Sequence, residues 1–247
     1  MLIENQIYIY DFVWAISEAI DLISPVLHNH HKKATYISGS IAQEMSLSND
    51  ETQDIILAAM LHDIGAFSME EWGMLLSFEV SDFDLDRHAF LGYSLLNGFK
   101  PLSKAADIIQ YHHACFSQQN RNIPIGSFII HLADRVSLFV DEHSEVLKQV
   151  SYILANLRQK QGTFHPDVFA AFEQLTKRES FWIEVSSSSL MRADMLRWVH
   201  LSKEFVGVET VRDFAKVTAQ IIDFRSRFTA THSSGVAVVA MELSRLS

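Results

Sequence analysis

Histidine and aspartate residues lie at several places in this chain where the neighbouring sequence is apolar. The clearest case is His62-Asp63, which follows the apolar run at residues 55–60. An ionised aspartate at the end of a buried helix is costly unless a cation or a metal ion compensates its charge. A single His-Asp pair could simply cap a helix, but five other residues offer the same chemistry. The candidate set is His30, His62, Asp63, His88, His112, His113 and Asp134.

Imidazole and carboxylate groups are ligands for iron, manganese, zinc and similar divalent ions. Seven such groups exceed what one ion needs, and a bridging carboxylate such as Asp63 would hold two ions about 4 Å apart. Binuclear sites of this kind activate water for attack on a phosphodiester. Asp134 favours this interpretation, because the apolar residues 129–133 predict a buried helix in which an uncompensated carboxylate would be costly.

The elements that must position these residues are predicted to be helices. Nine glycines, four prolines and long stretches of 3.6-residue periodicity indicate an all-α fold. Ser48 to Glu51 is a helix-start signal for the helix that delivers His62 and Asp63, and Gly65 is expected to end that helix. The other helices are expected at residues 7–23, 25–45, 69–78, 87–93, 101–113, 125–140, 144–158 and 166–177. Loops are expected at residues 82–86 and 114–124, and the serines at 186–189 indicate a break before two further helices within 208–246.

The amino-acid composition limits the kinds of partner that the chain is expected to bind. Thirty acidic residues against 20 basic ones give a net charge of −10, which excludes general affinity for a nucleic-acid polymer. The single cysteine, Cys115, rules out an internal disulfide framework and suits a reducing cytosol. No apolar run reaches the roughly 20 residues of a membrane span, and the start of the chain lacks the basic residues of a signal peptide. We therefore expect a cytoplasmic protein with no membrane partner.

The order and spacing of these residues resemble the HD superfamily of metal-dependent phosphohydrolases, and within it the HD-GYP group of cyclic-dinucleotide phosphodiesterases. The resemblance covers residues 25–140. The matching segments are 30–37 for the first histidine helix, His62-Asp63-Ile64-Gly65 for the signature, His88 followed by Gly92-Tyr93, the pair His112-His113, and 132–136 for the last metal-binding helix.

This resemblance implies an HD-domain helical bundle with two divalent transition-metal ions, iron or manganese ahead of zinc, nickel or magnesium. It implies that the seven candidates are metal ligands and that Asp63 is also catalytic. His30 is chosen over His28 and His31 because it lies 32 residues before His62, as the family spacing suggests. His28, His31 and His131 are expected to be surface or core histidines. Arg87, beside His88, would bind a phosphate of the substrate, although an exposed ion pair is an equally simple role.

Two departures from the family pattern lead to a second hypothesis. Ala66 stands where the group usually carries a lysine that contacts the phosphate, and residues 114–120 lack its usual motif. Val26 stands where trinuclear members carry a glutamate, which favours two ions. The first hypothesis is a phosphodiesterase for a small nucleotide, a cyclic di-GMP-like dinucleotide. The alternative is a non-catalytic metal-binding module that regulates a partner or a second domain.

The end of the chain resembles the beginning of the same pattern. Residues 232–240 align by residue type with residues 30–38, and this segment is similar to the opening helix of a second HD-type domain. No second His-Asp pair follows, so His232 should bind no catalytic metal. We expect an HD domain at residues 1–206 and a linker with one extra helix at 207–247, as in a chain truncated from a longer one. The apolar stripe of Val236, Val239, Ala240 and Leu243 predicts a homodimer through the C-terminal helices, or a helix folded back onto its own domain.

Overall fold

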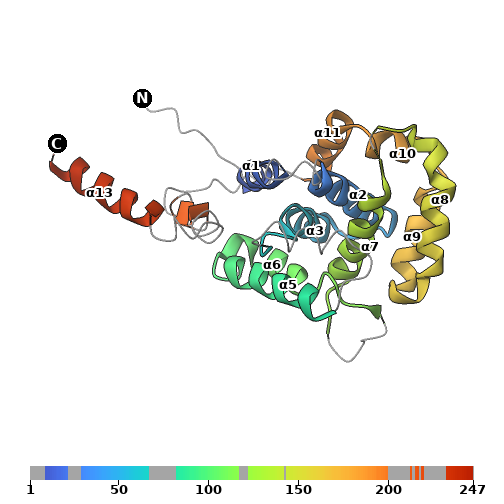
Figure 1. Ribbon diagram of the computed structural model, residues 1–247, viewed down its shortest axis with the longest axis horizontal. Coiled ribbons are helices and arrows are strands. Elements are labelled where there is room, and N and C mark those ends of the chain that lie inside the picture. The colour runs from blue at the N-terminus through green and yellow to red at the C-terminus, as the bar shows by residue number, and fades with distance from the viewer. Residues whose placement is uncertain are drawn as a thin grey trace.

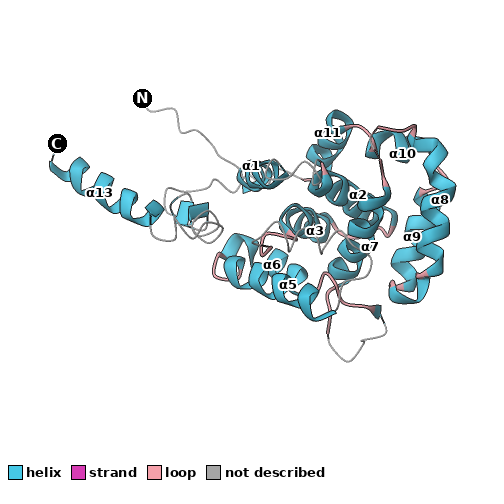
Figure 2. Cartoon of the chain, in the orientation of Figure 1, coloured by secondary structure: helices cyan, strands magenta, loops and turns pink. Residues whose placement is uncertain are grey.

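The computed structural model describes residues 9–21, 29–66, 82–116, 122–141, 143–199 and 232–246, together with residues 212, 215, 216, 218 and 219. Within these residues every regular element is a helix (Figures 1 and 2). The prediction of an all-α fold is confirmed.

A central helix, α2 (His30–Glu44), organises the helical body (Figure 1). It packs against α3 (Asn49–Leu61), α7 (Ile125–Phe139), α9 (Pro166–Leu175) and α11 (Ser188–Trp198). Its sequence is rich in polar residues, yet its positions 33–42 are all buried. One close contact depends on Gly39, because a Cβ atom there would lie 2.6 Å from the ring of Trp198. This helix is therefore enclosed by its neighbours, and its first turn contributes the buried side chains of His30 and His31 to the interior.

The remaining helices cover the two flanks of α2. On one side, α5 (Asp82–Leu96) packs on α6 (Ser103–Gln110), which packs on α3, while α1 (Ile9–Asp21) also contacts α3. On the other side lie α8 (Val146–Gln159) and α10 (Glu179–Val185) (Figure 1). Two short 3₁₀ turns, Lys100–Leu102 and Gln161–Thr163, precede α6 and α9. The core comprises apolar residues of all these helices.

The start of α3 follows the predicted signal. The Ser48 hydroxyl accepts a hydrogen bond from the Glu51 N–H at 3.3 Å, and the Glu51 carboxylate accepts one from the Ser48 N–H at 3.0 Å. This reciprocal pair satisfies two backbone donors that have no partner inside the helix. The end of α3 differs from the prediction, because the helix stops at Leu61 and residues 62–65 form a turn.

Gly65 does not act as the expected helix terminator, since its φ is not positive. Its role is steric. A Cβ atom on Gly65 would lie 2.1 Å from the carbonyl oxygen of His88 and 2.6 Å from the backbone nitrogen of Gly92. The turn after α3 and the middle of α5 therefore touch backbone to backbone, and only glycine fits between them.

Several other boundaries differ from the prediction. The acidic segment 82–86 is not a loop but the first part of α5. Residues 179–185 form α10, which was not predicted, and the serine break is confined to residues 186 and 187, because α11 begins at Ser188. The helix expected at 69–78 and the start of the helix expected at residue 25 lie outside the described residues.

The last helix, α13 (His232–Leu246), stands apart from the helical body in Figure 1. Val236, Val239 and Leu243 are each more than half exposed. The predicted stripe thus lies on a helix with little cover. In the part of the chain that the structure describes, none of the helices combines the length and the apolar character required to span a bilayer.

Candidate metal centre

The seven predicted ligands come together at one place. His30 begins α2, His62 and Asp63 lie in the turn after α3, and His88 lies in α5. His112 and His113 follow the end of α6, and Asp134 lies in α7. All seven side chains are buried. The structure gathers them into two adjoining groups, with Asp63 between the groups.

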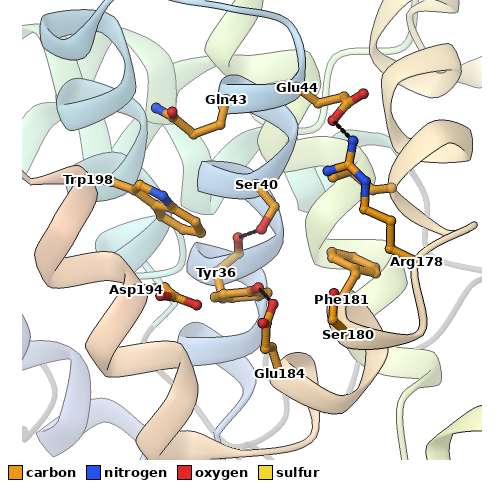
Figure 3. Close-up of a pocket in the computed structure, with 11 residues that line it drawn as sticks. Tyr36, Ser40, Gln43, Glu44, Arg178, Ser180, Phe181, Glu184, Asp194 and Trp198 are labelled. Atoms are coloured by element: carbon orange, nitrogen blue, oxygen red, sulfur yellow. Dashed lines mark hydrogen bonds and ion pairs between the residues drawn. The ribbon is translucent and has the colours of Figure 1, made fainter.

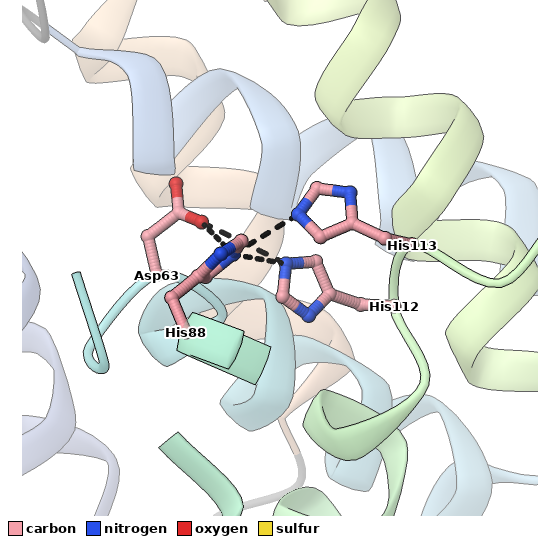
Figure 4. Close-up of side chains that lie close together, drawn as sticks. All are labelled: Asp63, His88, His112 and His113. Atoms are coloured by element: carbon pink, nitrogen blue, oxygen red, sulfur yellow. Dashed lines mark hydrogen bonds and ion pairs between the residues drawn. The ribbon is translucent and has the colours of Figure 1, made fainter. Parts of the chain in front are cut away.

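The first group comprises Asp63, His88, His112 and His113 (Figure 4). The Nε2 atom of His88 lies 3.2 Å from Nε2 of His112 and 3.0 Å from Nε2 of His113. The Asp63 Oδ1 atom lies 3.2 Å from Nε2 of His88. Metal–ligand bonds of about 2.0–2.2 Å place two ligands of one ion roughly 3–4 Å apart. The four ligand atoms therefore have the spacing that one ion requires.

The second group comprises His30, His62 and Asp134. The Asp134 Oδ1 atom lies 3.4 Å from Nε2 of His30 and 3.8 Å from Nε2 of His62. The other oxygen of Asp63, Oδ2, lies 3.5 Å and 3.0 Å from the same two nitrogens. One carboxylate thus directs one oxygen at each group, which is the arrangement of a bridging ligand.

Hydrogen bonds on the far side of three rings orient them for metal binding. Nδ1 of His62 donates to the carbonyl oxygen of Ala59 at 2.9 Å, and Nδ1 of His112 donates to that of Ile109 at 2.7 Å. A carbonyl only accepts, so each Nδ1 carries a proton, and each ring offers the lone pair of Nε2 once it is neutral. Metal-bound histidines in proteins are held in this way.

The ring of His30 is fixed by a similar relay. The Ser137 hydroxyl donates to the carbonyl oxygen of Asp134 at 2.7 Å, which leaves its oxygen to accept from Nδ1 of His30 at 3.0 Å. Nε2 of His30 then faces both carboxylates. The donor set fits divalent ions in each group.

The protonation states of the cluster residues also fit the binding of divalent ions. Burial opposes ionisation of Asp63, but the neighbouring His62, His112 and His30 hold its pKa well below the usual range. Burial lowers the pKa of His112 to about 4, so this ring is neutral at physiological pH. Burial also disfavours the charged form of His62, yet Asp63 and Asp134 raise its pKa well above the usual value. An ion that binds His62 must therefore displace a proton.

Other residues near the centre were not part of the predicted ligand set. His31 is fully buried, with Nε2 at 4.0 Å from Asp63 Oδ2, and it forms a third group with His62 and Asp63. The prediction of a surface or core role thus missed its position at the edge of the site. Arg135 is buried and places Nε at 3.4 Å from Asp134 Oδ2, the oxygen that faces away from His30. The sequence signal for Arg135 was its place beside Asp134 in an apolar helix.

The remaining candidates have mixed outcomes. Arg87 is exposed on α5 beside His88. His131 is a core histidine, with its ring 5.3 Å from that of Phe164. Ala66 is fully buried. His28 and Val26 lie outside the described residues, as does the middle of the 114–124 segment.

Comparisons with known proteins agree with this geometry. Residues 27–138 match the family model described as HD domain. The chain is 26% identical over 257 residues to 3'3'-cGAMP-specific phosphodiesterase 1 of Vibrio cholerae, covering 98% of this chain and 59% of that protein. It is 26% identical over 191 residues to a cyclic di-GMP phosphodiesterase of Thermotoga maritima, covering 68% of this chain and 50% of that protein.

A solved structure has the same fold. It is a cyclic GMP-AMP specific phosphodiesterase of V. cholerae, with a TM-score of 0.72 and 17% identity, matched over 96% of this chain and 66% of that one. The chain thus spans less than two thirds of the length of each of these three proteins.

Proposed function

We propose that residues 27–138, which match the HD domain family model, form a metal-dependent phosphodiesterase that hydrolyses a cyclic dinucleotide with a metal-activated water. The observation that carries the proposal is Asp63, whose two carboxylate oxygens face two separate groups of buried ligands. A phosphodiester-cleaving binuclear site needs such a bridge, because it keeps two ions about 4 Å apart.

The residues of the chain have distinct tasks in this proposal. His88, His112 and His113 hold one ion, and His30, His62 and Asp134 hold the other. Bound ions supply an activated water and stabilise the charge on the phosphate oxygens. Asp63 joins the two positions, and its ionised state at neutral pH fits that task. Arg87 is proposed to contact a phosphate of the substrate from the exposed surface of α5.

The names of the relatives support the proposed class of substrate. One is named for 3'3'-cGAMP and another for cyclic di-GMP, which are both cyclic dinucleotides. We therefore propose a cyclic dinucleotide for this chain without choosing between them.

A specific observation favours a second candidate, a non-catalytic metal-binding module. Ala66 replaces the lysine expected at that position, and its side chain is fully buried, so no cation reaches a phosphate from there. In this candidate the two groups of ligands serve stability or sensing, and hydrolysis belongs to another domain.

Metal analysis combined with an assay against a panel of cyclic dinucleotides tests the proposal. After reconstitution with iron or manganese, the chain should retain about two ions and hydrolyse at least one member of the panel. Asp63→Asn should abolish both, whereas Asp107→Asn, an exposed position on α6, should change neither. Full metal content with no hydrolysis would exclude the phosphodiesterase and support the non-catalytic metal-binding module. A chain that retains no metal would exclude both candidates.

A further inference from the structure

A second hollow lies away from the metal centre, on the side of α2 that faces α10 and α11 (Figure 3). Its volume is about 370 Å³, which falls within the roughly 300–1,000 Å³ of small-molecule sites. Tyr36, Ser40 and Glu44 line it from α2. Ser40 lies ten residues after His30, about 15 Å further along the helix axis. None of the groups able to hold a metal ion among the described residues lines this hollow.

Three aromatic rings form part of its wall. The ring of Tyr36 lies 6.2 Å from that of Phe181 and 5.4 Å from that of Trp198, measured between centroids. Figure 3 shows the Tyr36 side chain between Trp198 and Phe181. Aromatic rings carry negative charge on their faces and attract organic cations.

The charged groups of the lining are mainly acidic. Three carboxylates and one guanidinium line the hollow, which leaves a formal charge of −2. Arg178 is engaged by Glu44 at 2.7 Å, so it does not offset the other two carboxylates. Asp194 pairs with Arg197, whose side chain is exposed to solvent. Glu184 accepts a hydrogen bond from the Tyr36 hydroxyl and forms no ion pair among the residues that the structure describes.

The Tyr36 hydroxyl does not neutralise this acidic surface. Burial and the hydrogen bond to Glu184 raise the pKa of Tyr36, so the hydroxyl remains an uncharged donor at physiological pH. Figure 3 shows the side chains of Glu184 and Asp194 beside Tyr36.

We propose that this hollow is a binding site for a small organic ammonium ion, held by Glu184 and Asp194 and enclosed by the rings of Tyr36, Phe181 and Trp198. An anion would meet the two carboxylates, and an uncharged ligand would leave Glu184 without a cation. A cation with an apolar body satisfies both parts of the wall, since its charge meets the carboxylates and its hydrocarbon part meets the rings.

Calorimetric titration of the metal-loaded, full-length chain tests this site. The probes are n-butylammonium against 1-butanol, and choline against its uncharged isostere 3,3-dimethyl-1-butanol. Sodium chloride at equal ionic strength corrects for general attraction of cations to an acidic protein. At least one cation should bind about tenfold or more tightly than its uncharged counterpart. No binding of either cation at millimolar concentration, or equal binding of the uncharged counterpart, would overturn the proposal.

Matched variants locate the binding. Glu184→Gln and Asp194→Asn each remove one charge with little change of shape, and each should weaken cation binding about tenfold. Glu145→Gln removes an exposed carboxylate before α8, outside the hollow, and should leave binding unchanged. Unaltered metal content in each variant shows that the fold is intact. Equal binding by all variants would place the cation elsewhere and refute the site, whatever the hydrolysis assay shows.

Discussion

Arg135 acts on the charge at the metal centre without being among the predicted ligands. Its guanidinium approaches the oxygen of Asp134 that faces away from His30. Burial raises the pKa of Asp134, but Arg135 and the nearby histidines bring it well below the usual range. The arginine therefore keeps a buried carboxylate ionised and oriented before any ion binds.

Arg135→Met should weaken metal binding by about 10- to 100-fold, because Asp134 loses the cation that holds it in place. The affinity is measured by titration of the metal-free protein with Mn²⁺. Arg158→Met, which breaks an exposed ion pair with Glu173, should leave that affinity unchanged. Equal metal affinity of Arg135→Met and the unmutated chain would show that Asp134 needs no support.

The buried core residue His131 predicts a dependence of stability on pH. Burial lowers the pKa of His131 from 6.5 to about 4. The unfolded chain therefore binds more protons than the folded one between these two values, and the folded state loses stability as the pH falls through that window. From pH 7.5 to pH 5 this one group should cost about 2 kcal/mol.

The comparison of the unmutated chain with His131→Phe, both without metal, checks this expectation. The free energy of unfolding in urea is measured at both pH values. The variant should lose about 2 kcal/mol less over this range, even if it is less stable at pH 7.5. Identical losses in both proteins would mean that His131 takes up its proton without unfolding.

At the scale of the elements, the contact between the turn after α3 and α5 sets the distance between His88 and Asp63 within the first ligand group. Gly65 and Gly92 allow these backbones to touch, and this contact brings His88 to Asp63. Any side chain on Gly65 must push α5 outward.

Gly65→Ala should therefore destabilise the fold by about 1–3 kcal/mol and lower the metal content, because His88 leaves the group. Thermal unfolding and elemental analysis measure the two effects. Gly98→Ala is the matched control, since a Cβ atom there would meet nothing within 4 Å. If Gly65→Ala retained full metal content and stability, the close approach would have no role in building the site.

The elements also show which parts of the fold the sequence predicted and why others were missed. The helix start at Ser48 was predictable because a capping box is a local interaction within four residues. The acidic residues at 82–86 were misread as a loop, although carboxylates are favourable in the first turn of a helix. α10 and α11 were missed because their apolar positions face α2 and α8, and these contacts are not encoded in local periodicity.

The candidate site was predictable for a related reason. A buried His or Asp is rare without a partner, so each ligand stood out inside an apolar segment. His31 and Arg135 did not stand out, because their roles depend on which face of a helix turns towards Asp63. The metal content and the roles of the seven residues remain predictions, as does the domain boundary near residue 206.

At the scale of the whole molecule, α13 predicts self-association. Val236, Val239 and Leu243 lie on one exposed stripe, and an uncovered apolar stripe in water favours a partner. A second copy of the chain is the simplest one. Val239→Glu with Leu243→Glu should convert a dimer at tens of micromolar into a monomer in light scattering. Val238→Glu, on the opposite face of the helix, should leave the dimer intact. If the unmutated chain is a monomer, the dimer prediction is wrong, and the stripe would instead be covered by another surface.

The burial of α2 has a consequence for hydrogen exchange and for the way the chain unfolds. Backbone amides exchange with solvent only when their hydrogen bonds break, and those in the most enclosed element exchange at the rate of global unfolding. α2 packs against six other helices, whereas every side chain of α13 whose burial the structure describes is exposed. Deuterium uptake followed by mass spectrometry should therefore be slowest in peptides of α2 and fast in those of α13. His30 would then leave the cluster only when the whole domain unfolds.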